Sequence, residues 1–290
     1  MKKSRKLATL GICSALFLGL AACQQQHATS EGTNQRQSSS AKVPWKASYT
    51  NLNNQVSTEE VKSLLSAHLD PNSVDAFFNL VNDYNTIVGS TGLSGDFTSF
   101  THTEYDVEKI SHLWNQKKGD FVGTNCRINS YCLLKNSVTI PKLEKNDQLL
   151  FLDNDAIDKG KVFDLQDKEE FDILFSRVPT EATTDVKVHA EKMETFFSQF
   201  QFNEKARMLS VVLHDNLDGE YLFVGHVGVL VPADDGFLFV EKLTFEEPYQ
   251  AIKFASKEDC YKYLGTKYAD YTGEGLAKPF IMDNDKWVKL

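Results

Sequence analysis

Clusters of basic residues are absent beyond the first six positions, although the chain has 31 lysines and arginines against 40 acidic residues. Surfaces that bind nucleic acid need such clusters, so we exclude nucleic acid as a partner. The early basic residues belong to a leader described below, and without them the formal charge of −9 becomes −13. This acidic balance favours solubility but does not indicate a function.

Motifs of several enzyme classes are also missing. The sequence has no Gly-x-Ser-x-Gly nucleophile elbow, no phosphate-binding loop and no spacing of histidines and cysteines typical of a zinc site. Asp153, Asp155 and Asp158 are close together, but their segment lacks the glycine and the terminal glutamate of a calcium-binding loop. We therefore predict neither a metal ion nor a cofactor, and we interpret residues 149–161 as a solvated acidic stretch.

Long apolar runs are scarce, and the longest, residues 7–20, follows Lys2, Lys3, Arg5 and Lys6. A membrane span needs about 20 apolar residues, whereas a short apolar run after basic residues is typical of a secretory signal. The run ends in Leu20-Ala21-Ala22-Cys23, which resembles the lipobox of bacterial lipoproteins. The resemblance implies a signal peptide over residues 1–22 and a lipid on Cys23, which would hold the protein at the extracellular face of the cell membrane.

The segment after the leader has little apolar surface. Residues 23–49 include runs of three glutamines and three serines, so we predict a disordered tether there. The remaining residues, 50–290, are enough for a single globular domain. None of its apolar runs is long enough to cross a bilayer, and no internal repeat is visible.

Cysteine is rare, with five residues in the whole chain. If Cys23 carries a lipid, Cys126, Cys132 and Cys260 remain in the mature protein, so at least one of them is unpaired within the chain. Cys126 and Cys132 would lie about 9 Å apart on one helix, too far for a disulfide. Cys132 could still meet Cys260.

The order of the predicted elements indicates the fold class. Ser57-Thr58-Glu59-Glu60 resembles a capping box for a helix ending at residue 69, and Asp70-Pro71 begins the next helix. Further helices are predicted over residues 106–118, 124–134, 167–177, 187–200 and 256–268. Strands are predicted over residues 208–214, 221–231, 237–244 and 249–254, with an edge strand within 280–288. This order predicts an α+β fold, with N-terminal helices packed on a C-terminal antiparallel sheet.

Cys126 is the first candidate for a catalytic residue. Gly123 permits a tight turn, and Thr124 is a suitable cap for the helix that follows. A thiol at a helix N-terminus lies at the positive end of the helix dipole, which favours the thiolate. The alternative is that Cys126 is a small buried hydrophobic residue, as most free cysteines are.

His226 is the candidate base, because it lies in an apolar strand between Gly225 and Gly228 and needs a partner there. Alternation along the strand places it on one face with Leu222, Val224, Gly228 and Leu230. If Val231 pairs with Gly236 across a hairpin, His226 faces Glu241; a loop one residue longer would bring Lys242 there instead. His214 is the alternative base, and His68, His102, His112 and His189 are interpreted as solvated.

The order of these candidates resembles the papain-like arrangement, in particular that of the compact NlpC-type cell-wall amidases and peptidases. In this arrangement a thiol on a helix is followed by a histidine on a strand and by a polar residue on the next strand. The resemblance covers residues 120–254 and rests on Asn125-Cys126 and His226-Val227-Gly228-Val229. The usual Asp-Cys-Ser-Gly-Phe run is replaced here. The chain also resembles a family of Gram-positive lipoproteins with a domain of unknown function, through Asn125-Cys126-Arg127 and Glu247-Pro248-Tyr249-Gln250.

The resemblance implies a papain-like cysteine hydrolase or acyl transferase acting on a peptide or amide bond, with peptidoglycan as a candidate substrate. Cys126 would be the nucleophile, His226 the base and Glu241 the residue that orients the imidazole. The Cys126 backbone N–H would supply half of an oxyanion hole, and Asn115, Gln116 and Asn125 are candidates for the second donor. The alternative is a non-catalytic envelope lipoprotein that binds a peptide, a glycan or a protein partner.

Overall fold

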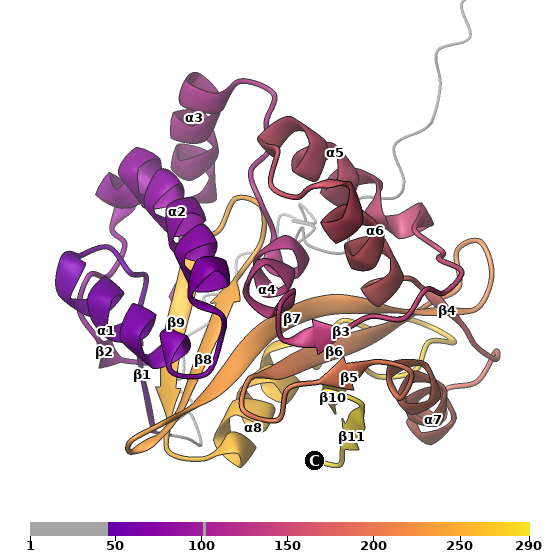
Figure 1. Cartoon of the computed structure of the whole chain (residues 1–290). Coiled ribbons are helices and arrows are strands. Elements are labelled where there is room, and N and C mark those ends of the chain that lie inside the picture. Colours follow the sequence, from indigo (N-terminus) through magenta and orange to yellow (C-terminus); the bar gives the residue numbers. More distant parts are fainter. Residues whose placement is uncertain (1–45, 101–102) are drawn as a thin grey trace, which may run out of the picture. The chain divides into compact units, whose positions relative to one another are not determined.

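The computed structural model describes residues 46–100 and 103–290, and Figure 1 shows their arrangement. Several predicted features lie outside these residues: the signal peptide, the lipidation of Cys23 and nearly all of the tether. His102 lies outside them as well. The domain boundary expected at residue 50 falls inside the first strand, Ala47–Thr50, which pairs with a strand near the C-terminus. The folded part therefore begins a few residues earlier than predicted.

The helices begin at good capping residues. Asp70 caps the second helix by accepting a hydrogen bond from the Ser73 N–H at 3.0 Å, as predicted. The first helix differs, because Asn54 and not Ser57 is its cap. The α-helices are α1 (Gln55–Ser66), α2 (Pro71–Val88), α3 (Val107–Lys118), α4 (Cys126–Leu134), α5 (Phe151–Gly160), α6 (Leu165–Leu174), α7 (Val186–Phe197) and α8 (Lys257–Lys267), with short 3₁₀ turns at Gly89–Thr91 and Gln148–Leu150.

The strands form one large antiparallel sheet and one small one, which confirms the α+β class. The large sheet has the order β11-β10-β6-β7-β8-β9-β1-β2, with β4 paired to β7, and the small sheet pairs β3 with β5. The predicted edge strand over residues 280–288 is a hairpin of two strands. The strands are β1 (Ala47–Thr50), β2 (Thr98–Ser99), β3 (Val138–Thr139), β4 (Val178–Pro179), β5 (Gln201–Phe202), β6 (Arg207–Asp215), β7 (Tyr221–Ala233), β8 (Gly236–Lys242), β9 (Tyr249–Phe254), β10 (Phe280–Asp283) and β11 (Lys286–Val288).

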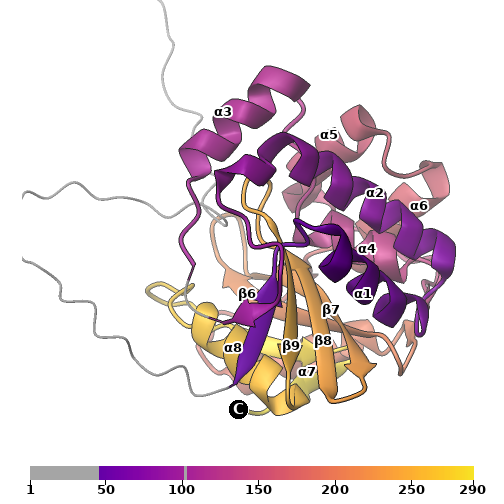
Figure 2. The ribbon, with the colours of Figure 1, turned by 90° about the vertical axis from the view of Figure 1, so that its left-hand side faces the viewer.

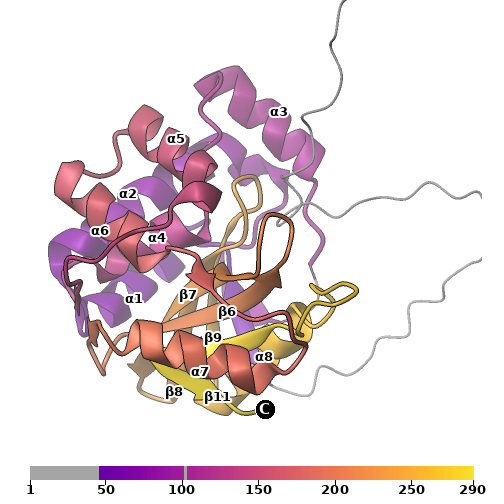
Figure 3. The same cartoon turned by 90° about the vertical axis from the view of Figure 1, so that its right-hand side faces the viewer.

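Each face of the large sheet has its own hydrophobic core. Helix α4 packs on one face, next to α2, and Val227 and Val229 of β7 point into this core. Helix α8 packs on the other face, where Leu230 and Phe239 point. Figure 2 shows α8 and α4 on opposite sides of the strands, and Figure 3 shows α7 and α8 beside the β10–β11 end of the sheet.

The three cysteines of the described residues are divided between these two cores. Cys126, Cys132 and Cys260 are all free and buried. Cys132 belongs to the core under α4, whereas Cys260 belongs to the core under α8. The possible pairing of Cys132 with Cys260 is therefore wrong, because the sheet separates them. In the part of the chain that the structure describes, no helix combines the length and the apolarity needed to span a bilayer.

Candidate active site

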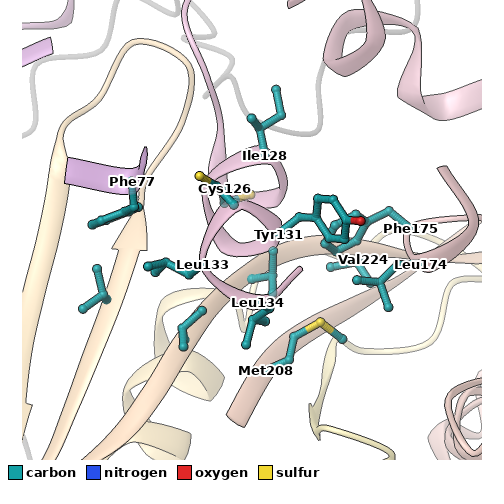
Figure 4. Close-up of a cluster of buried hydrophobic side chains, with 14 of the residues drawn as sticks. Phe77, Cys126, Ile128, Tyr131, Leu133, Leu134, Leu174, Phe175, Met208 and Val224 are labelled. Atoms are coloured by element: carbon teal, nitrogen blue, oxygen red, sulfur yellow. The ribbon is translucent and has the colours of Figure 1, made fainter. Parts of the chain in front are cut away.

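Cys126 lies in the first turn of α4, as the sequence predicts. It is the first residue of the helix, whose cap is Asn125 and not Thr124. The Asn125 Oδ1 accepts the Ile128 N–H at 3.1 Å, which satisfies one of the free N–H groups at the start of the helix. Gly123 has a φ of +91°, which explains why a glycine precedes this turn. Figure 4 shows Cys126 in the first turn of α4, in an apolar cluster that includes Ile128 and Leu133 of the same helix.

A β-bulge determines the direction of His226. In the β6–β7 ladder, Val224 pairs with Val212 and His226 pairs with Val211, which leaves Gly225 as the extra residue. The bulge shifts the alternation by one position. His226 therefore shares its face with Gly228 and Leu230, whereas Leu222 and Val224 point into the opposite core.

The hairpin between β7 and β8 is tighter than predicted, because Ala233 and not Val231 pairs with Gly236. This difference of two positions preserves the face on which every side chain lies. His226 and Glu241 are therefore diagonal neighbours on one face and still meet. The Nε2 atom of His226 lies 2.5 Å from Oε2 of Glu241, at a point beyond the last paired residues of the ladder, Val229 and Val240.

Glu241 is fully buried and held by residues of α8. Its Oε1 accepts a hydrogen bond from the Tyr263 hydroxyl and one from Lys267 Nζ at 3.4 Å. Burial alone would raise the pKa of Glu241. Lys267, His226 and Tyr263 together outweigh burial and lower this pKa to about 2, so the carboxylate is ionised at neutral pH.

The His226 ring also contacts the thiol. The side chain of Cys126 lies close enough to His226 to raise the pKa of the imidazole. Since Nε2 is engaged by Glu241, Nδ1 is the nitrogen left for the sulfur. Burial lowers the pKa of His226, but the charges and hydrogen bonds of Cys126 and Glu241 outweigh burial and raise it. The imidazolium is therefore favoured beside the ionised Glu241 carboxylate.

The three residues are closed off from solvent. Cys126 is 2% exposed, and His226 and Glu241 are each 1% exposed. The ring of Tyr268 stacks on the imidazole with 4.9 Å between the ring centres and 24° between the ring planes. A hollow of about 510 Å³ lies elsewhere, between α7 and β4, so it does not lead to this thiol. A large substrate can reach the sulfur only if the cover moves.

The expected oxyanion donors lie in different places. Asn115 and Gln116 are exposed on α3, and Gln116 hydrogen-bonds to His112 at 2.9 Å. Asn125 is at the site, but its side chain already caps α4 and donates to Asp153 at 2.7 Å. The first turn of α4 itself presents backbone N–H groups without helical partners, and Cys126 contributes one of them.

His214, the alternative base, is engaged elsewhere. Its Nε2 is bonded to Glu220 at 2.7 Å, and its Nδ1 accepts the Ala277 N–H at 3.0 Å. The ring lies against His189, with 4.4 Å between the ring centres. His189 is completely buried, contrary to the expectation that it is solvated, because Thr180 and Thr183 satisfy both of its nitrogens.

Sequence reasoning missed the residues that support the site. Tyr263 and Lys267 are four residues apart on α8, a spacing that places both on one helix face, and both reach Glu241. This spacing was the only signal in the sequence, and it does not name the partner strand. The acidic stretch over residues 149–161 was also misinterpreted, because Asp153 on α5 is completely buried beside Asn125. Among residues 46–100 and 103–290, no group of acidic, histidine or cysteine side chains is placed to hold a metal ion.

Comparison with known proteins identifies a family but no function. The family described as "Domain of unknown function (DUF4300)" matches residues 48–288, which is nearly the whole described part of the chain. No curated protein and no solved structure matches the chain. The match confirms the resemblance to a family with a domain of unknown function, and it leaves the chemistry to be argued from the site.

Proposed function

The chain belongs to the DUF4300 family, a domain of unknown function, and we propose from its site that it is a papain-like cysteine hydrolase or acyl transferase acting on a peptide or amide bond. One observation carries the proposal: the His226 imidazole is bonded to the Glu241 carboxylate and interacts with the Cys126 side chain. Thiol, imidazole and carboxylate in this order are the parts that nucleophilic catalysis by cysteine requires.

Each group has a role in the reaction. The Cys126 thiolate forms a bond to the substrate carbonyl carbon, and the oxygen takes the electron pair close to the N-terminus of α4. The His226 imidazolium gives its proton to the leaving amine as the C–N bond breaks. For hydrolysis, His226 then takes a proton from water, which attacks the thioester and releases the carboxylate and the thiol. Glu241 keeps the ring in the required orientation throughout.

The predicted location of the protein suggests its substrate. We propose that Cys23 carries a lipid and that the enzyme works on the extracellular face of the cell membrane. Stem peptides of peptidoglycan are amide-rich substrates that an enzyme in this location would meet. The burial of Cys126 favours a second candidate, a binding lipoprotein whose thiol is only a packed core residue.

Product analysis distinguishes these two functions. Full-length wild-type protein and the Cys126→Ser variant would be incubated with peptidoglycan and with a library of peptide amides, and products would be identified by mass spectrometry. A thioester adduct on Cys126, and products that are missing with Cys126→Ser, would support the enzyme. Binding of either material with equal strength by both proteins, without products or adducts, would support the binding function instead.

A further inference from the structure

Asp153 is a completely buried carboxylate that accepts three hydrogen bonds near the site. It lies in the first turn of α5, and its Oδ1 accepts from Asn125 at 2.7 Å and from Arg127 Nε at 2.9 Å. Its Oδ2 accepts from Arg127 Nη2 at 2.7 Å. The two arginine bonds form a bidentate pair, which fixes the guanidinium in direction as well as in position.

The partners of Asp153 are the two residues on either side of the nucleophile. Asn125 caps α4 with its Oδ1, so the bond from its Nδ2 to Asp153 fixes the capping side chain. Arg127 follows Cys126 in the first turn of the helix. Asp153 therefore determines where the N-terminus of α4 lies, and with it the place of the Cys126 sulfur.

Arg127 also connects this network to the strand that carries the base. Its Nη1 donates to the Val224 carbonyl at 3.0 Å. Val224 comes directly before Gly225, the extra residue of the bulge that turns His226 toward Glu241. One guanidinium, anchored by one carboxylate, therefore contacts both the thiol's helix and the strand backbone two residues before the imidazole.

We propose that Asp153 is a positioning residue for the Cys126–His226 pair, acting through Asn125 on the helix and through Arg127 on both the helix and the bulged strand. This inference rests on the proposed function. It assigns a role to a buried charge whose only polar partners among the described residues are the two neighbours of the nucleophile. A displacement of about 1 Å between reacting groups can reduce a rate about 100-fold, so such an anchor has a measurable effect on chemistry.

The test compares full-length wild-type protein with Asp153→Asn and Arg127→Lys. Asp172→Asn is the matched control, because Asp172 is also buried and ion-paired, to Lys145 at 2.7 Å, but belongs to α6. The rate of Cys126 alkylation by iodoacetamide would be measured at about pH 6 and about pH 9.5. Nitrogen-15 NMR of labelled histidine would report the protonation of the His226 ring, and circular dichroism would confirm folding.

We expect Asp153→Asn and Arg127→Lys to slow alkylation at about pH 6 by about tenfold or more, with a smaller change at about pH 9.5, where any thiol is ionised. The His226 ring nitrogens should shift toward the neutral form in both variants. The control should change the rate at either pH by less than about twofold. A variant that is merely loosened would instead react faster at both pH values.

Two failures are distinguishable. If wild-type Cys126 does not react at about pH 6, the proposed function fails and the positioning role fails with it. If wild-type Cys126 reacts and both variants keep its pH profile and its His226 spectrum, the proposed function stands and the inference about Asp153 is overturned. Arg127→Lys retains a positive charge beside Asp153, so it provides the result if Asp153→Asn does not fold.

Discussion

Glu241 Oε2 lies 2.5 Å from His226 Nε2, although the ladder between their strands ends at Val229 and Val240. The two side chains lie on the α8 face of the sheet, whereas Cys126 belongs to the core under α4. Helix α4 contacts both β7 and β8. The proposed chemistry therefore combines residues from both faces of the sheet.

The first prediction concerns stability in acid. The pKa of Glu241 is lowered to about 2 in the folded protein, so its stabilising contribution is present above the unfolded pKa of about 4.3 and is lost as the pH falls through 2. The contribution is on the order of 3 kcal/mol at neutral pH. Replacement of Glu241 with glutamine should therefore flatten the dependence of unfolding free energy on pH between about 5 and 2. Urea titrations of both proteins at several pH values would measure this.

A matched control exists in the same fold. Glu246→Gln removes a half-buried carboxylate of the β8–β9 loop. In this variant the unfolding free energy should still fall between about pH 5 and about pH 2, as in wild-type protein. If Glu241→Gln and wild-type protein lose stability in parallel below pH 5, the carboxylate is not ionised against His226, and the orienting role of Glu241 is wrong.

The second prediction concerns Lys242, whose ammonium is completely buried. Its Nζ donates to the carbonyls of Thr244 at 2.7 Å and Phe245 at 3.1 Å, and also to that of Glu247. Lys242→Met would leave three carbonyls of the β8–β9 loop without a donor, and we expect a loss of about 2–4 kcal/mol in unfolding free energy. Chemical denaturation at about pH 6 would measure it. Lys253→Met is the control, because Lys253 is a partly exposed lysine of β9 that is paired to Glu60.

The same lysine predicts a pH effect. Burial lowers the pKa of Lys242 to about 7, against the opposing charges of Glu246 and Glu247. The unfolded chain holds this proton up to about pH 10.4, so the folded protein gains stability relative to Lys242→Met as the pH rises from about 7 to about 10. A stability difference that stays constant over this range would show that the buried amine does not titrate there.

The third prediction concerns packing under the histidine strand. A Cβ atom on Gly228 would lie 2.3 Å from the Phe239 ring and 2.8 Å from the Val240 carbonyl. Because the carbonyl belongs to the backbone, the strands must separate, and Gly228→Ala should lower the unfolding free energy by about 1–3 kcal/mol. Gly273→Ala is the control, since its Cβ would meet only Leu276 at 3.5 Å. Equal melting temperatures for the two variants would contradict the packing described here.

The sequence predicted the parts of the fold that local chemistry determines. Asp70 and Pro71 begin α2 as expected, because a side-chain cap and a proline in the first turn act without tertiary help. The pair of His226 and Glu241 was also predicted, from an incorrect register. The prediction that these two side chains meet was still correct, because a shift of two residues in the hairpin keeps every side chain on the same face of the sheet.

Tertiary structure decided what the sequence could not. The bulge at Gly225 depends on the pairing of β7 with β6, so simple alternation along β7 placed Leu222 and Val224 on the wrong face. Asp153 has the same appearance in sequence as the exposed acidic residues around it. Its burial follows from the packing of α5 beside Arg127, a contact between residues 26 positions apart.

In the proposed mechanism His226 activates Cys126, and the pH dependence of Cys126 alkylation distinguishes an activated thiol from an ordinary one. Alkylation by iodoacetamide would be followed by mass spectrometry in full-length wild-type protein and in His226→Ala, with buried Cys132 as the internal reference. An ordinary cysteine with a pKa of about 8.5 reacts roughly 200-fold more slowly at pH 6 than at pH 9. We predict that wild-type Cys126 loses less than about tenfold over this range and that His226→Ala follows the ordinary curve. Identical ordinary curves for the two proteins would show that His226 does not activate the Cys126 thiol.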